Sequence, residues 1–132
     1  MDSSLLALIK NLVSILPTDW SKVTFSTFIR ECVVNDKKTY SKEFKCYCLS
    51  DSCDVPINIV KVYEDNFEVE DLFFDFLDYF YKNQFNGKDG YNFITFKLDL
   101  EGNYEINKLS LENDISNSDI VSIISEYIKK NI

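Results

Sequence analysis

The 132-residue sequence contains no histidine, and this absence excludes a large group of enzymes. Ser-His-Asp and Cys-His catalysis, imidazole general-base catalysis and histidine-based metal sites all require a side chain that the chain lacks. Carboxylate-pair hydrolysis and lysine Schiff-base chemistry remain formally possible, but each requires a recessed pocket that shifts the pKa of an acid or an amine. Nothing in the sequence indicates such a pocket. We therefore expect no catalytic residue, no cofactor and no enzymatic activity.

Positive charge is also scarce. The chain has 14 Lys and Arg against 22 Asp and Glu, a formal net charge of −8, and Arg30 is its single arginine. Proteins that bind nucleic acid use a basic surface to displace counterions from the phosphates. We therefore expect no direct binding to DNA or RNA.

Long apolar runs are absent. No segment approaches the roughly 18 continuous apolar residues of a membrane span. Near the N-terminus, Asp2 precedes the apolar stretch and Lys10-Asn11 interrupts it, whereas a secretory signal has a basic start and an unbroken apolar region. The sequence thus predicts a cytoplasmic protein that does not associate with membranes.

The four cysteines agree with a cytoplasmic location, where thiols stay reduced. Cys46 and Cys48 are two residues apart in a strand-like stretch, so their side chains share a face and cannot easily bridge each other. With Cys53 they form C-x-C-x4-C, which differs from the C-x2-C spacing of a zinc ribbon. A thiolate metal site and structural disulfides are the alternatives, but we expect these cysteines and Cys32 to act as small, buried apolar residues.

The chain is 45% hydrophobic and 15% aromatic, which is enough apolar surface for one packed domain over residues 1–132. Apolar spacings of three and four residues predict three amphipathic helices, over residues 4–16, 66–85 and 117–130. Alternation with a period of two predicts five strands, over residues 22–33, 40–48, 55–63, 93–100 and 104–109.

Local signals refine these elements. Ser3 or Ser4 is expected to cap the first helix, and a change of phase at Ser26-Thr27 indicates a bulge in the first strand. The order α-β-β-β-α-β-β-α predicts an α+β fold, an antiparallel sheet of about five strands with the helices packed against one face.

Acidic residues gather at the second predicted helix. Between Tyr63 and Lys82 there is no basic residue but there are seven acidic ones: Glu64, Asp65, Glu68, Glu70, Asp71, Asp75 and Asp78. The helix dipole favours anions in the first turn, so a solvated helix start explains Glu68, Glu70 and Asp71. Asp75 and Asp78 lie further along. They share one side of the helix with Asp71, where like charges destabilise the helix by a few tenths of a kcal/mol per pair.

Two aromatic residues of this helix, Phe74 and Tyr81, are expected beside these carboxylates, on the side opposite the apolar face. Exposed rings among carboxylates are typical of a protein-binding surface. The alternative is that sheet and loop cover the helix on both sides. The interface hypothesis names seven residues: Glu64, Asp65, Asp71, Phe74, Asp75, Asp78 and Tyr81.

Other acidic residues suggest weaker alternatives. A glycosidase uses a pair of acidic residues, and two pairs have this composition: Asp75 with Asp78, and Asp99 with Glu101. The first pair is expected to stay hydrated on the helix surface, and the second is better explained by hydrogen bonding within a hairpin turn. No D-x-[DN]-x-[DN]-G calcium loop is present, and the stretch from Asn113 to Asp119 is better explained as a loop and a helix cap. We assign no metal.

Two stretches together indicate a family. Residues 15–23, ILPTDWSKV, resemble the "LPxxWxKV" opening of the YezG-type antitoxins, which are bacterial immunity proteins that accompany secreted polymorphic toxins. Residues 91–104, YNFITFKLDLEGNY, resemble the family's "WxNLTFxLxxxGxF" hairpin, with Tyr91 where the family usually carries Trp. The order and spacing agree over most of residues 5–114. The resemblance implies a small cytoplasmic protein that binds one cognate toxin domain, often a nuclease, and blocks it.

The charge of the chain agrees with this expectation, because a nuclease presents a basic groove that an acidic partner reaches quickly by electrostatic steering. A second hypothesis is an acidic chaperone of a type III secretion effector. Such chaperones share this order of elements, but they are homodimers that hold an extended segment of the effector. A monomer bound to a folded toxin domain would favour the immunity protein.

Overall fold

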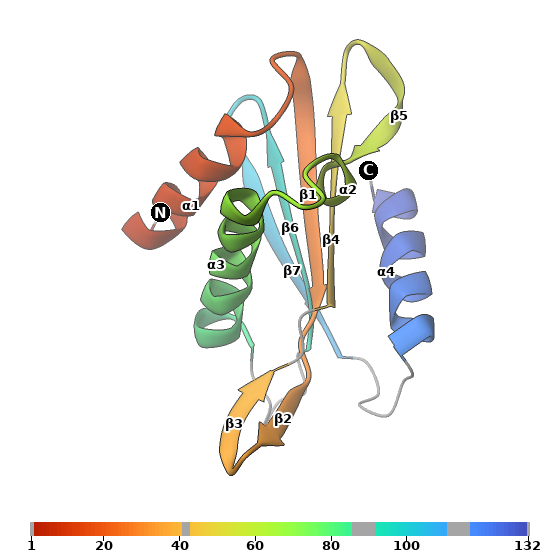
Figure 1. The fold of residues 1–132 in the computed structure, drawn as a ribbon. Coiled ribbons are helices and arrows are strands. Elements are labelled where there is room, and N and C mark those ends of the chain that lie inside the picture. Colours follow the sequence, from red (N-terminus) through yellow and green to blue (C-terminus); the bar gives the residue numbers. More distant parts are fainter. Residues whose placement is uncertain (1, 41–42, 86–91, 111–116, 132) are drawn as a thin grey trace.

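The computed structural model describes residues 2–40, 43–85, 92–110 and 117–131. Figure 1 shows its elements in chain order: α1 (Ser3–Ser14), β1 (Trp20–Phe28), β2 (Glu31–Val34), β3 (Lys37–Tyr40), β4 (Glu43–Ser50), β5 (Cys53–Asn58), α2 (Ile59–Val62), α3 (Phe67–Asn83), β6 (Phe93–Asp99), β7 (Tyr104–Leu109) and α4 (Asn117–Asn131). The predicted class, α+β, is confirmed.

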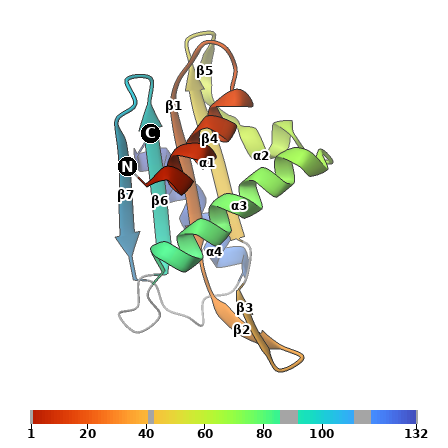
Figure 2. The same cartoon turned by 90° about the vertical axis from the view of Figure 1, so that its left-hand side faces the viewer.

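Five strands form one antiparallel sheet in the order β5-β4-β1-β6-β7. The predicted antiparallel sheet of about five strands is therefore confirmed. The expectation that the helices cover one face is wrong. α1 and α3 lie on one face of the sheet and α4 lies on the other, as the two views of Figures 1 and 2 show.

The central strand β1 explains why helices are needed on both faces. Its residues 23–28 are all buried. Phe25 belongs to the larger core beneath α1 and α3, whereas Phe28 packs with Phe93, Ile120 and Ile124 in a second core beneath α4. A strand that is buried on both faces has no simple apolar alternation. The predicted bulge at residues 26–27 is therefore wrong: the pairing runs without a shift from Lys22 to Phe28.

The larger core is built mainly from aromatic rings. Phe25 lies at its centre, with ring centroids 5.5–6.2 Å from those of four other rings, Phe44, Phe73, Phe76 and Phe80. Burying one such ring fully contributes about 1.5–3 kcal/mol to the free energy of folding. This cluster holds α3 against β1 and β4.

Two local predictions need correction here. Asp2, not Ser3 or Ser4, caps α1 and accepts a hydrogen bond from the Ser4 amide at 2.8 Å. The strand predicted over 55–63 ends at Asn58, because the Asn58 side chain accepts from the Lys61 amide at 3.1 Å and starts the short helix α2.

The segment that follows β1 is not a continuation of that strand. β2 and β3 form a separate two-stranded sheet, joined by Asn35 and Asp36 at φ values of 52° and 64°. Asn and Asp tolerate this left-handed conformation better than most residues, and two of them in succession favour a tight hairpin. The hairpin extends beyond the main sheet (Figure 1), and Val33 and Val34 on it are 70% and 54% exposed.

The cysteines divide into two groups. Cys46 and Cys48 are buried on β4, as predicted, and burial raises the pKa of the Cys48 thiol to about 11. Cys32 is exposed on β2 and Cys53 is half-buried on β5, so the prediction of a buried residue is wrong for Cys32. All four are free thiols.

Candidate functional site: an acid-rimmed hollow beside α3

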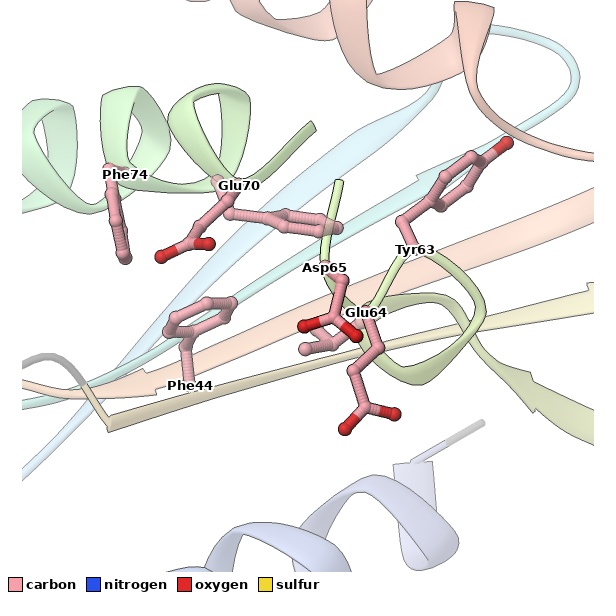
Figure 3. Close-up of a pocket in the computed structure, with 8 residues that line it drawn as sticks. Phe44, Tyr63, Glu64, Asp65, Glu70 and Phe74 are labelled. Carbon is pink, nitrogen blue, oxygen red and sulfur yellow. The ribbon is translucent and has the colours of Figure 1, made fainter. Parts of the chain in front are cut away.

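A hollow of about 370 Å³ opens where α2, the start of α3 and β4 meet. It lies on the α1 and α3 side of the sheet (Figure 3). Its wall is formed by eight residues: Phe44, Val60, Tyr63, Glu64, Asp65, Glu70, Phe73 and Phe74. We call this feature the acid-rimmed hollow.

The floor of the hollow is apolar and fixed by ring contacts. The Phe44 ring, on β4, lies 5.6 Å from Phe73 and 6.2 Å from Phe74 between centroids. The Phe44 and Phe74 rings are nearly perpendicular, at 80°. Edge-to-face pairs of this kind are favourable, and Phe73 is itself part of the core. The floor is therefore a packed aromatic surface that continues the core to the outside.

The rim of the hollow carries three exposed carboxylates, those of Glu64, Asp65 and Glu70. In Figure 3, Glu70 extends from α3, while Asp65 and Glu64 extend from the loop between α2 and α3, with the Phe44 ring below. Negative charge thus surrounds an aromatic floor.

The loop that carries two of these carboxylates is held by specific contacts. The Tyr63 hydroxyl donates to the Ile15 carbonyl at 2.6 Å and ties the end of α2 to the end of α1. Asp65 adopts a left-handed backbone conformation, φ 68°. The next residue, Asn66, caps α3 by accepting from the Val69 amide at 3.2 Å. These contacts fix the path of the chain at the rim.

Among the described residues, no cationic side chain forms an ion pair with the carboxylates near the hollow. Within residues 2–40, 43–85, 92–110 and 117–131, the one ion pair joins Lys38 to Glu31, at 2.8 Å in the β2–β3 hairpin. Asp71 and Asp75 are also exposed on α3, but they do not line the hollow. The acidic charge of this region is therefore uncompensated by its neighbours.

The structure divides the seven predicted interface residues into three groups. Glu64, Asp65 and Phe74 line the hollow. Asp71 and Asp75 are exposed on α3 but do not line it, and the last two, Asp78 and Tyr81, belong to a separate contact further along the helix.

That separate contact attaches the β2–β3 hairpin to α3. The Tyr40 hydroxyl donates to the Asp78 carboxylate, and the Tyr40 ring stacks on Tyr81 with centroids 4.5 Å apart. The Tyr81 hydroxyl donates to Glu31 at 3.2 Å, and its ring stacks on Phe85. Burial, with Asp78 as the second cause, raises the pKa of Tyr40 above its ordinary value.

The expectation that Phe74 and Tyr81 are exposed rings opposite the core face is wrong. Both are half-buried and pack against the edge of the larger core. Sheet and hairpin cover this side of α3, which is the alternative that the sequence left open. Phe74 still reaches the surface as part of the hollow.

Several wall residues are not among the predicted interface residues, above all Glu70 and Phe44. The position of Glu70 at the helix start explains its charge, but Glu70 also lies one helical turn before Phe74, and residues four apart on a helix are neighbours. That spacing was a usable signal. The sequence gives no comparable signal for Phe44, because only the tertiary structure places the start of β4 beneath α3.

The other acidic pair has a structural role. Asp99 accepts hydrogen bonds from the amides of Glu101 and Asn103 at 2.9 and 3.0 Å, and Gly102 supplies a φ of 84° in the same turn. The interpretation of Asp99 and Glu101 as turn residues is confirmed. The stretch 113–116, interpreted as a loop, and Tyr91 lie outside the described residues.

Within the described residues, no group of three or more His, Cys, Asp or Glu side chains is placed to hold a metal ion. None of the helices in those same ranges is long and apolar enough to cross a membrane. In comparisons with known proteins, no protein-family model matches the chain, and no curated protein matches it.

Proposed function

We propose that this protein is an immunity protein, or antitoxin, that binds one cognate bacterial toxin domain in the cytoplasm and neutralises it. The toxin domain is basic, and a nuclease fits this requirement. The likeness of residues 15–23 and 91–104 to the YezG-type antitoxins supports this proposal. Its physical support is independent of that likeness and comes from the charge of one face.

The observation that carries the proposal is the uncompensated negative charge around α3. Glu64, Asp65, Glu70, Asp71 and Asp75 are exposed, and no ion pair neutralises them among the residues that the structure describes. Such a surface repels nucleic acid but attracts a protein that presents a basic groove. Electrostatic complementarity can raise association rate constants from about 10⁵–10⁶ to about 10⁸–10⁹ M⁻¹s⁻¹ at low salt.

Inhibition in this proposal is stoichiometric. One protein covers one toxin domain, and the complex blocks access of the substrate without any covalent step. Aromatic side chains at the surface hold the complex once it has formed, because buried rings are frequent anchors of interfaces. Phe74, Tyr40 and Tyr81 are half-buried at the border of the acidic face, and their rings are the proposed anchors.

A charge-reversal experiment tests the proposal. Asp71→Lys and Asp75→Lys are introduced together, and binding to the toxin domain encoded by the neighbouring gene is measured by surface plasmon resonance at low and at physiological salt. Asp78 is left unchanged because it accepts the Tyr40 hydrogen bond. We expect binding at low salt to weaken about tenfold or more, mostly through slower association.

The matched control is Glu101→Lys with Glu105→Lys, which changes the net charge equally but lies at the β6–β7 end of the sheet, where both side chains are exposed. The proposal fails if both double variants bind alike or if the unmodified protein does not bind the toxin domain. A homodimer that holds an extended effector segment, detected by light scattering, would support the secretion chaperone instead.

A further inference from the structure

We propose that the acid-rimmed hollow is a binding site for one arginine side chain of the partner protein. This inference rests on the proposed function for its biological partner, but its chemistry follows from the wall of the hollow alone. It names the kind of side chain that the partner inserts beside α3.

The dimensions of the hollow suit a single long side chain. Its volume, about 370 Å³, lies at the lower end of the range of about 300–1,000 Å³ found for ligand sites. The apolar floor formed by Val60, Phe44 and Phe73 offers contact for a methylene stem. A long cationic side chain buries such a stem and leaves its charged head near the solvent.

The rim selects the head group. In Figure 3 the Glu70 carboxylate extends from α3 beside the Phe44 and Phe74 rings, and Asp65 and Glu64 extend from the loop before α3 on the other side of the hollow. Anionic and neutral polar groups gain no favourable charge interaction with these carboxylates. A purely apolar side chain would cover the rings but would leave the carboxylates partly desolvated and unpaired, which costs free energy.

Among cations, guanidinium fits this combination better than ammonium. It is planar, stacks on aromatic faces, forms paired hydrogen bonds with carboxylates and is more weakly hydrated than the lysine ammonium group. The perpendicular Phe44 and Phe74 rings present aromatic surface beside Glu70, which is four residues before Phe74. Stacking and charge pairing are thus available in one place.

The chain's own arginine is not the occupant. Arg30 lies with its guanidinium carbon 5.3 Å from the centre of the Phe28 ring, and Phe28 belongs to the second core on the α4 side of the sheet. The hollow lies on the opposite side, beneath α3. The arginine is therefore expected to come from another protein.

The first test uses a small probe. The ¹⁵N-labelled protein is titrated with N-acetyl-arginine amide, N-acetyl-lysine amide and N-acetyl-citrulline amide, and amide shifts are followed by NMR. We expect the arginine probe to shift amides of the hollow, the lysine probe to act more weakly and citrulline, which is uncharged, to leave them unchanged. Equal responses to arginine and citrulline, or shifts confined to other surfaces, would overturn the inference.

The second test uses a pair of variants on one helix. Glu70→Gln removes a rim carboxylate, whereas Glu68→Gln makes the same charge change in the same helical turn at an exposed position that does not line the hollow. We expect Glu70→Gln to weaken binding of both the arginine probe and the toxin domain about tenfold. We expect Glu68→Gln to leave both affinities nearly unchanged. Phe74→Leu, which keeps an apolar side chain but removes the ring, should likewise weaken binding of the arginine probe.

The outcomes separate this inference from the proposed function. One outcome is that the toxin domain binds, that the double variant Asp71→Lys with Asp75→Lys weakens this binding, and that Glu70→Gln does not. In that case the arginine site is wrong and the immunity function stands. If the toxin domain does not bind but the arginine probe does, the immunity function is wrong and the site stands.

Discussion

At the scale of single residues, the position of the rim depends on one unusual backbone conformation. Asp65 has a φ of 68° between the end of α2 and the cap of α3. Left-handed backbone is unfavourable for most L-residues, is adopted more readily by Asn and Asp, and is forbidden in practice to β-branched side chains. The residue type at this position therefore serves both the charge of the rim and the path of the loop.

Substitutions at Asp65 separate these two effects. Asp65→Asn keeps a residue that tolerates the left-handed conformation and removes the charge, so we expect little change in the free energy of unfolding but weaker binding of the arginine probe. Asp65→Val should lower the free energy of unfolding by about 1–3 kcal/mol, because the branched side chain opposes this backbone. Urea denaturation measures the free energy of unfolding of each variant. Equal stability of Asp65→Asn and Asp65→Val would contradict this account.

At the scale of elements, the β2–β3 hairpin and α3 are joined by aromatic stacking and by two hydrogen bonds, Tyr40 to Asp78 and Tyr81 to Glu31. The rings of Tyr40, Tyr81 and Phe85 follow one another at 4.5 and 5.5 Å, and the Tyr40 hydroxyl donates to Asp78. Among the residues that the structure describes, this stack is the only ring contact between the hairpin and α3, so Tyr40 connects the hairpin to the body of the protein.

The pH dependence of stability tests this joint. Because folding raises the pKa of Tyr40, this group favours the folded state fully below its unfolded pKa of about 10, and the contribution is lost as the pH rises above that value. We expect the melting temperature to fall above about pH 10, and Tyr40→Phe to reduce this alkaline loss while lowering stability slightly at neutral pH.

Calorimetry from pH 7 to pH 11 measures this dependence. Tyr79 and Tyr81 also have raised pKa values, so part of the alkaline loss should remain in the variant. Identical alkaline profiles of Tyr40→Phe and the unmodified protein would contradict the role of Tyr40.

At the scale of the whole molecule, the sheet separates two cores that serve different purposes. The larger core supports α3 and the acid-rimmed hollow. The smaller core, formed by Phe28, Phe93, Ile120 and Ile124, holds α4 on the far face. The C-terminal helix is therefore expected to contribute stability and not binding.

Substitution of a buried residue of α4 tests this separation. Ile124→Ala should lower the free energy of unfolding by about 2–5 kcal/mol, because it opens a cavity over Phe28 and Phe93. Val121→Ala, at a partly exposed position of the same helix, should cost much less. At a temperature where both variants are folded, affinity for the toxin domain should match that of the unmodified protein, and a selective loss in Ile124→Ala would place α4 in the interface.

Much of the fold could be predicted from the chain. The helix over 67–83 follows from its apolar spacing and from the Asn66 cap, and the β6–β7 hairpin follows from alternation around Gly102. Both depend on interactions between residues close in sequence. The separate hairpin at 31–40 and the helical turn at 59–62 were missed, because short elements have too few residues to set a period.

The sequence by itself determined the charge of the molecule, its three long helices, most of its strands and the acidic stretch before and along α3, since these are local properties. Only the tertiary structure decided that helices cover both faces of the sheet and that Phe44 lies beneath Phe74 to form the hollow. It also decided that Tyr81 is covered by Tyr40. The reason is that these contacts join residues many positions apart, and such contacts are set by packing of the sheet and not by the period of any one segment.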